Sequence, residues 1–202
     1  MNNRTWLLLC TALFTGAAFA QTTVNHPYNT GAQSFTLASG AYINYYDNGG
    51  SASSYSNSSS PLTSIVTFTP ANPTQKIQVT FTSFSTEDTW DALYIYNGNV
   101  AETPDLTNTS VTTPLPNQFN SGSAQGHTFR SGGFMGTGSP GTVISTAASG
   151  ALTFQFDSDG SVTDAGWTAT VTSICEAFGT NDAGVISIDS FTQFCPGTYP
   201  IY

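Results

Sequence analysis

The sequence predicts an all-β fold, a two-sheet antiparallel β-sandwich. Short runs of alternating apolar and polar residues recur along the 202-residue chain, separated by Gly, Pro, Asn and Ser. Aromatic residues make up 13% of the chain and charged residues only 7%, which is the opposite of the composition of disordered proteins. Beyond the N-terminus, no stretch of ten residues has the three-to-four spacing of an amphipathic helix. The length suits one ordinary domain with a sizeable core.

The first twenty residues predict a cleaved secretory signal. Arg4 supplies the positive start, residues 6–14 form an apolar run, and Ala18-Phe-Ala20 is a small-x-small cleavage site before Gln21. The apolar run is too short to span a bilayer, so we expect no membrane insertion. We therefore expect a secreted protein, extracellular or held at the cell surface, after cleavage near Ala20.

The predicted mature chain is strongly acidic. Cleavage leaves Lys76 and Arg130 against twelve acidic side chains, a net charge of about −10. Such a surface repels nucleic acid and anionic lipid, because proteins bind both through Lys and Arg. Cationic partners, metal ions and neutral sugars remain open, as does the simpler interpretation that the acidity keeps an exported protein soluble.

The strands are expected one after another, with turns between them. Residues 21–33 are polar and aperiodic, with Pro27 and Gly31, and predict a leader segment. The tetrapeptide Asp47-Asn-Gly-Gly50 predicts a turn, because Asn and Gly tolerate positive φ. Residues 99–141 are irregular and predict surface loops with a short strand or two. The eight or nine expected strands suit a two-sheet sandwich; the main ones are residues 34–37, 41–46, 64–68, 76–84, 92–97, 142–146, 151–157 and 166–174.

The last 28 residues, 175–202, do not continue this regular succession of strands and turns. Residues 185–191 have one more strand pattern, but so short a segment builds no core of its own. We expect the start of a second, truncated β-domain of a longer protein; the alternative is a terminal strand packed on the main domain. Whether Cys175 pairs with Cys195 stays open, and a disulfide there would contribute about 3 kcal/mol.

Two acidic clusters stand at the ends of expected strands. Glu87, Asp88 and Asp91 lie in the turn before residues 92–97, and Asp91 shares the inward parity of that strand. Asp159 follows the strand 151–157. Inward acids at strand ends need partners, and oxygen ligands outside the cell usually bind Ca²⁺. The alternative is that these acids cap turns and face water.

The loop after residue 157 is not an EF-hand. Counted from Asp157, its sixth position is Val162, where an EF-hand needs glycine, and its twelfth is Thr168, where it needs glutamate. The hypothesis is instead that both acidic clusters face one calcium ion.

Three spaced motifs resemble the CUB domain, over residues 34–174. They are Phe81-x-x-Phe-x-x-Glu87, Trp90-Asp-Ala-Leu-Tyr-Ile-Tyr-Asn-Gly98, and Leu152-x-Phe-x-Phe-x-Ser-Asp-Gly-Ser161 with Gly166-Trp-x-Ala169. Residues 47–50 and 55–57 fit the opening segment of bacterial members. The resemblance implies a jelly-roll sandwich that acts as an extracellular, non-catalytic binding module of a larger secreted protein. The expected domains are thus 1–20 signal, 21–33 leader, 34–174 CUB-like and 175–202 second domain.

The resemblance also implies a calcium site. Calcium-binding members of the family use a Glu and two Asp at positions that correspond here to Glu87, Asp91 and Asp159, with the Gly160 carbonyl and Ser161 as further ligands. The usual cysteines of animal members are absent, and the spacing from Glu87 to Asp91 is shorter than the family's. Asp88 is therefore an alternative to Glu87, and Asp164 is a further alternate.

Catalysis is not expected. The chain has two histidines, His26 in the leader and His127 in the irregular stretch, both without the spacing of a catalytic triad or a metal site, and both read as exposed loop residues. The expected function is binding or adhesion, with an extracellular protein or a glycan as partner. The alternatives are a carbohydrate-binding module and a structural spacer in an adhesin or a secreted protease. Tyr46, Tyr55, Tyr94 and Tyr96 would offer stacking surfaces for sugars if exposed, or are half-buried strand residues.

Overall fold

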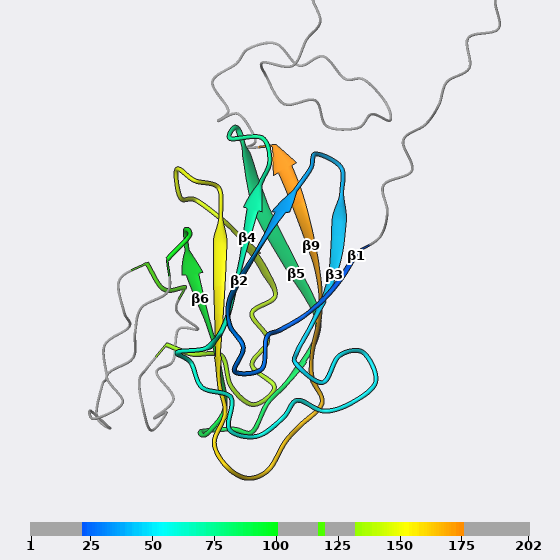
Figure 1. The fold of residues 1–202 in the computed structure, drawn as a ribbon, viewed down its shortest axis with the longest axis vertical. Coiled ribbons are helices and arrows are strands. Elements are labelled where there is room, and N and C mark those ends of the chain that lie inside the picture. The colour runs from blue at the N-terminus through cyan, green and yellow to red at the C-terminus, as the bar shows by residue number, and fades with distance from the viewer. Residues whose placement is uncertain (1–21, 101–116, 120–131, 176–202) are drawn as a thin grey trace, which may run out of the picture.

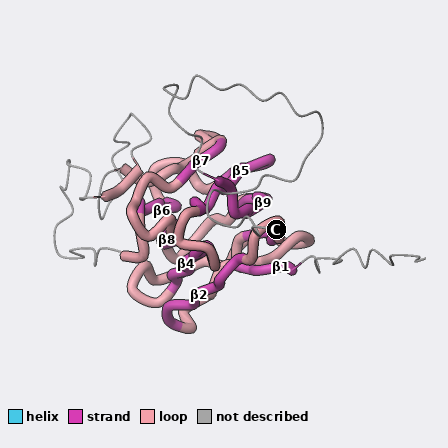
Figure 2. Tube along the Cα trace, turned by 90° about the horizontal axis from the view of Figure 1, so that it is seen from above, coloured by secondary structure: helices cyan, strands magenta, loops and turns pink. Residues whose placement is uncertain are grey.

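The computed structural model describes residues 22–100, 117–119 and 132–175, which form two sheets packed face to face (Figure 1). One sheet has five strands in the order β1-β3-β9-β5-β7, and the other has four in the order β2-β4-β8-β6. The view from above shows the two layers (Figure 2). The predicted all-β sandwich is confirmed. The nine strands of the described residues are β1 (Thr22–Asn25), β2 (Gly31–Leu37), β3 (Tyr42–Tyr46), β4 (Ser64–Pro70), β5 (Gln75–Ser85), β6 (Ala92–Asn97), β7 (Thr142–Ile144), β8 (Leu152–Asp157) and β9 (Gly166–Cys175).

Odd-numbered strands lie in one sheet and even-numbered strands in the other, so every connection crosses between the layers. This explains one departure from the prediction: β1 pairs with β3, and β2 with β4, in parallel. From β1 to β4 each crossing reverses the chain direction, so β1 and β3, and likewise β2 and β4, run the same way. The pairs β5–β7 and β6–β8 are also two strands apart in the sequence, but they are antiparallel. The other five strand pairings are antiparallel, as predicted.

Three connections meet at one end of the sandwich, here called the acidic end. The register pairs Tyr46 with Thr168, and Ser85 with Gly166, in the five-stranded sheet. In the other sheet Ala92, at the start of β6, pairs with the last residue of β8. The acidic end therefore comprises the loops 47–63, 86–91 and 158–165.

The core lies between the sheets, and its members follow the predicted alternation. Ile77, Val79 and Phe81 on β5 are buried, as are the inward residues of β6, β8 and β9. The Trp167 indole, near the start of β9, is buried and packs on the ring of Phe156, with ring centroids 5.1 Å apart. Aromatic rings from both sheets thus interlock beneath the acidic end.

The strand β6 is buried on both faces, which the alternating pattern does not predict. Tyr94 and Tyr96 are completely buried on the outer face, where they cluster with Ala92 and Met135. The edge of β6 also pairs with Phe134 and with Gln118, through the bridges Leu93–Phe134 and Tyr96–Gln118. Segments of the irregular stretch therefore cover this sheet.

This burial corrects the expected sugar-stacking surface. Tyr94, Tyr96 and Tyr55 are each no more than 2% exposed, and Tyr46 is half-buried. Three of the four tyrosines therefore offer no face to a sugar ring.

The N-terminal segment also differs from its prediction. Residues expected to form a leader form β1 and the start of β2, and Val24 is buried in the core. An edge strand of four residues with one inward side chain shows no periodicity in the sequence. His26, expected in an exposed loop, is 2% exposed: its Nε2 lies 2.9 Å from the Ser64 carbonyl oxygen, and its Nδ1 2.7 Å from the Tyr45 hydroxyl.

Other predictions fall on parts of the chain that the structure does not describe. The signal at 1–20, His127 and the second domain beyond residue 175 lie outside the described residues. Cys175 ends β9 and is disulfide-bonded, while Cys195 lies outside the described residues. Within the described ranges, none of the structure is a helix with the length and apolarity needed to cross a membrane.

Candidate metal centre

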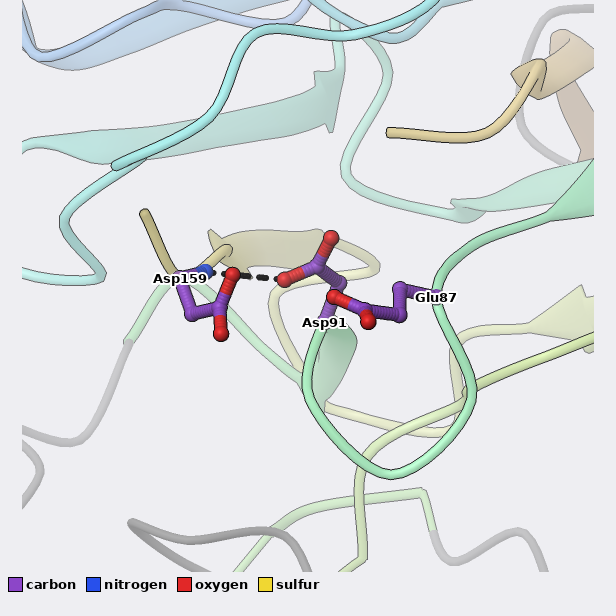
Figure 3. A group of neighbouring side chains, drawn as sticks. All are labelled: Glu87, Asp91 and Asp159. Carbon is purple, nitrogen blue, oxygen red and sulfur yellow. Dashed lines mark hydrogen bonds between the residues drawn. The ribbon is translucent and has the colours of Figure 1, made fainter. Parts of the chain in front are cut away.

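Three predicted acidic residues come together at the acidic end. Glu87 and Asp91 stand at the two ends of the turn between β5 and β6, and Asp159 follows β8 (Figure 3). One carboxylate oxygen from each lies within 4.8 Å of the others. Asp91 is completely buried, and Glu87 and Asp159 are half-buried. The prediction that Asp91 points inward is confirmed, because this residue directly precedes β6 and is completely buried.

The carboxylate of Asp91 is held on both sides. Its Oδ2 accepts a hydrogen bond from the Tyr55 hydroxyl at 2.6 Å, and its Oδ1 accepts one from the Asp159 backbone N–H at 2.8 Å. Burial nevertheless raises the pKa of Asp91 to about 6, since these two donors only partly replace water. A bound cation would favour the charged form and reverse this shift.

Glu87 contributes a carboxylate with one oxygen that lacks a hydrogen-bond donor. Its backbone is fixed, because Glu87 N–H donates to the Tyr55 hydroxyl at 2.9 Å and its carbonyl accepts from Asp91 N–H at 3.1 Å. Its Oε2, however, is shielded from solvent and has no hydrogen-bond partner. Burial raises the pKa of Glu87, and the charges of Asp159 and Asp164 raise it further. A buried carboxylate oxygen without a donor is costly, and a metal ion would satisfy it.

The loop that carries Asp159 is fixed by backbone contacts. The Asp159 carbonyl accepts from Ser58 N–H at 2.5 Å, and Ser158 N–H donates to the Ser59 carbonyl at 3.0 Å. Ser161 N–H donates to Asp159 Oδ1 at 2.8 Å. Ser161 thus orients the third carboxylate, and ion ligation by Ser161 or by the Gly160 carbonyl stays a prediction.

The two alternate acids lie outside the triad. Asp88 and Asp164 line a neighbouring cleft of about 510 Å³, whose wall includes Thr86 and residues 133–139. Asp164 Oδ2 accepts from the Ser85 hydroxyl at 3.3 Å. The geometry therefore places Glu87, and not Asp88, with Asp91 and Asp159.

Tyr55 is the residue of this site whose role the sequence did not show. Its ring packs on Phe156, with ring centroids 5.1 Å apart, and its hydroxyl joins the Asp91 carboxylate to the Glu87 backbone. The one sequence signal was a tyrosine in an otherwise Ser-rich loop. An aromatic residue in such a loop is a candidate for a buried anchor.

Asp47 is a second acid whose role only the structure shows. It is completely buried; its Oδ1 accepts from Gly49 N–H at 2.7 Å and its Oδ2 from Trp167 N–H at 3.1 Å. Despite these bonds, burial raises the pKa of Asp47 to about 6. This acid therefore ties the loop after β3 to the start of β9.

Two loops at the acidic end contain strained backbone. Thr89, with φ of 78°, and Val162, with φ of 58°, are β-branched residues in the left-handed region. Each lies in a loop that carries an acid of the triad. Such strain persists where the surroundings enforce one conformation, and it is common at binding sites.

We expect Val162→Gly to raise the free energy of unfolding by about 1 kcal/mol, because glycine adopts positive φ freely. Val162 is 58% exposed, so little apolar burial is lost. Urea denaturation measures the effect. Val100 is also exposed, at 46%, and does not have a positive φ. Val100→Gly is therefore the matched control and should be destabilising; stabilisation by both changes, or by neither, would contradict the strain.

Comparison with known proteins shows likeness in structure alone. No protein-family model matches this chain, and no curated protein matches it in sequence. Among solved structures, the full extracellular region of zebrafish Gpr126/Adgrg6 is similar with a TM-score of 0.47 and 18% identity, over 71% of this chain and 15% of that one. The CUB1-EGF-CUB2 domains of rat MASP-1 are similar with a TM-score of 0.42 and 15% identity, over 70% of this chain and 43% of that one. This chain thus spans less than half of either protein.

Proposed function

We propose that this protein is a CUB-like, non-catalytic binding module that acts outside the cell and carries a Ca²⁺ site at the acidic end. Glu87, Asp91 and Asp159 would hold the ion, with the Gly160 carbonyl and Ser161 as further ligands. One observation carries the proposal: three carboxylates lie within 4.8 Å of one another, and the buried Glu87 Oε2 has no hydrogen-bond partner. Ca²⁺ bound there would order the loops at this end.

The set of donors suits calcium. All three side chains offer carboxylate oxygens, which hard cations prefer, and the group includes no Cys or His ligand. The three acids come from two separate loops. Such an arrangement suits Ca²⁺, which accepts variable ligand distances, better than Mg²⁺, which requires a near-ideal octahedron of ligands.

The partner we propose is an extracellular protein that presents a Lys or Arg side chain. Asp88 and Asp164 place two further carboxylates in the cleft beside the triad, and Phe134 and Met135 line the same cleft. An apolar side-chain stem with a charged head suits such a surface. Lys76 lies near the start of β5, at the far end of that strand from Glu87, so it does not neutralise these acids.

The other candidates have less support. A carbohydrate-binding module would need a face of exposed aromatic rings. Three of the four tyrosines considered for that role are buried, and the exposed Tyr28, Tyr42 and Trp90 belong to three separate segments of the chain. A structural spacer would not require three carboxylates held this close together. Binding through the acidic end is therefore the function that we put to the test.

We expect Ca²⁺ to raise the melting temperature of the wild-type protein relative to chelator, because an ion that binds only the folded state stabilises it by mass action. Asp91→Asn should lose most of this shift, since Asp91 lies in the middle of the triad in Figure 3 and is completely buried. Scanning calorimetry measures both proteins, and titration calorimetry measures the affinity directly.

Asp88→Asn is the matched control. It removes one charge from the same turn but no member of the triad, and should therefore keep the Ca²⁺-dependent shift. A wild-type protein without a shift would contradict the calcium site. A shift lost in Asp88→Asn but retained in Asp91→Asn would assign the ion to other ligands.

A further inference from the structure

The turn after β1 is joined to the loop that contacts Asp159. Asn29, with φ of 53°, donates from Nδ2 to the Ser58 carbonyl at 2.8 Å. Its Oδ1 accepts from the Ser60 backbone N–H at 2.6 Å. The same oxygen lies 3.3 Å from the Thr63 hydroxyl and 3.2 Å from that of Ser64. One side chain therefore spans the segment 58–64.

The far end of this turn is anchored in the core. His26 is 2% exposed and is surrounded by the rings of Tyr45, Phe156 and Trp167, with centroids 5.5 to 6.1 Å from its own. Tyr28, between these two residues, donates from its hydroxyl to the Asn57 carbonyl at 3.0 Å. The turn 26–29 thus connects the core, through His26, to the Ser-rich loop, through Tyr28 and Asn29.

From this loop the contacts continue into the acidic triad. Ser58, itself at a positive φ of 61°, donates its N–H to the Asp159 carbonyl at 2.5 Å. Asp159 in turn donates its N–H to Asp91 Oδ1. A continuous series of hydrogen bonds therefore leads from Asn29 through Ser58 and Asp159 to Asp91.

Side chains organise the Ser-rich loop from several sides. Asn48 and Ser158 each form hydrogen bonds with Ser56 and Ser59. The Asn29 side chain forms those with the Ser58 carbonyl and the Ser60 N–H. Residues 56–60 form no strand, and their side chains are small and polar. Side-chain bonds to the backbone are what organise such a loop. Without the Asn29 side chain, the Ser58 carbonyl and the Ser60 N–H would turn to water, and the backbone that fixes Asp159 would loosen.

We propose that Asn29 is a positioning residue for the acidic site: it holds the loop 58–60 against Asp159 and thereby sets the affinity of the triad for its cation. The inference rests on the proposed function. The turn lies more than a hundred residues from Asp159 in the sequence, and no motif points to it. Outer groups that orient metal ligands typically change metal affinity by about ten- to a hundredfold.

The test is Asn29→Gly, which keeps the left-handed backbone conformation and removes the amide. Titration calorimetry should show Ca²⁺ affinity weakened by about tenfold relative to wild type. A second readout needs no ion: in chelator, amide hydrogen exchange at Ser58, Ser60 and Asp159 should be faster in the variant than in the wild type.

Asn72→Ala is the control, because the Asn72 side chain likewise organises a turn, between β4 and β5 at the opposite end of the sandwich. Its Oδ1 accepts from the Thr74 N–H at 3.0 Å and from the Thr74 hydroxyl at 2.9 Å. Ca²⁺ affinity should stay at the wild-type value in this variant.

The outcomes separate this inference from the proposed function. A wild-type protein that binds no Ca²⁺ would overturn both. Binding by the wild type together with equal affinity in Asn29→Gly would overturn the positioning role alone. Equal weakening in Asn29→Gly and Asn72→Ala would also overturn it, since general destabilisation would then explain the loss.

Discussion

Replacing Gly166 by alanine is expected to lower the free energy of unfolding by about 3 kcal/mol or more. An added Cβ would lie 2.0 Å from Asp47 Oδ2 and 2.3 Å from its Cγ, while φ at Gly166 is +72°. The Asp47 side chain cannot move away from the added Cβ, because it is completely buried and accepts hydrogen bonds from the backbone N–H groups of Gly49 and Trp167. Overpacking of this kind costs about 1–3 kcal/mol, and the left-handed conformation of a non-glycine residue adds about 1–2 kcal/mol.

Gly141→Ala separates the two contributions. Gly141 has a similar φ of +68°, and an added Cβ there would meet no atom within 4 Å. This control should therefore cost only the backbone strain, about 1–2 kcal/mol. Urea denaturation of both variants gives the comparison. Equal losses would mean that Asp47 does not pack against Gly166 as described.

Acidification is expected to destabilise the wild-type protein relative to His26→Gln, by about 2 kcal/mol between about pH 7 and about pH 5. Burial lowers the pKa of His26 from 6.5 to about 4. The unfolded chain therefore binds a proton in this range that the folded chain does not, and stability is lost as the pH falls from 6.5 towards 4. Denaturation curves of both proteins at the two pH values, in metal-free buffer, measure the change.

Glutamine is the suitable replacement for His26. The Ser64 carbonyl can only accept, so the hydrogen-bond network implies that His26 carries its proton on Nε2 and accepts at Nδ1 from the Tyr45 hydroxyl. A glutamine amide can make the same pair of bonds without titrating.

The comparison with His26→Gln also removes an opposing effect. Burial raises the pKa values of Asp47 and Asp91 to about 6, and acidification through that range stabilises the fold. Because both proteins share these acids, their contribution cancels in the difference. A difference in stability that does not change with pH would contradict the buried neutral histidine.

Alternation along the sequence predicted most of the strands, because a half-buried strand must place apolar side chains at every second position. Residues 92–97 were predicted with the bounds that β6 has, and Ile77, Val79 and Phe81 proved to share the core face. The prediction failed for β1, which is too short to show a period. It also did not reveal that β6 is covered on both faces, since aromatic residues such as Tyr94 and Tyr96 occur on exposed and buried strands alike.

At the candidate site, the sequence predicted the residue types and only the fold decided their arrangement. Parity placed Asp91 inward, and the motifs that resemble CUB domains pointed to Glu87 and Asp159; the structure brings one carboxylate oxygen from each within 4.8 Å. The choice between Glu87 and Asp88 depended on the course of a turn with a left-handed residue at Thr89, which no spacing predicts.

By itself, the sequence determined the fold class and the inward-facing residues, because these follow from the local geometry of a strand. Only the tertiary structure decided which loops meet. Tyr55, Asp47 and His26 each form a hydrogen bond with a residue 19 to 120 positions away. Such contacts arise from the alternation of successive strands between two sheets, which brings the loops of distant strands to one end. The acidic site is therefore a product of topology, built from side chains whose local sequence shows only that they are acidic and stand at the ends of strands.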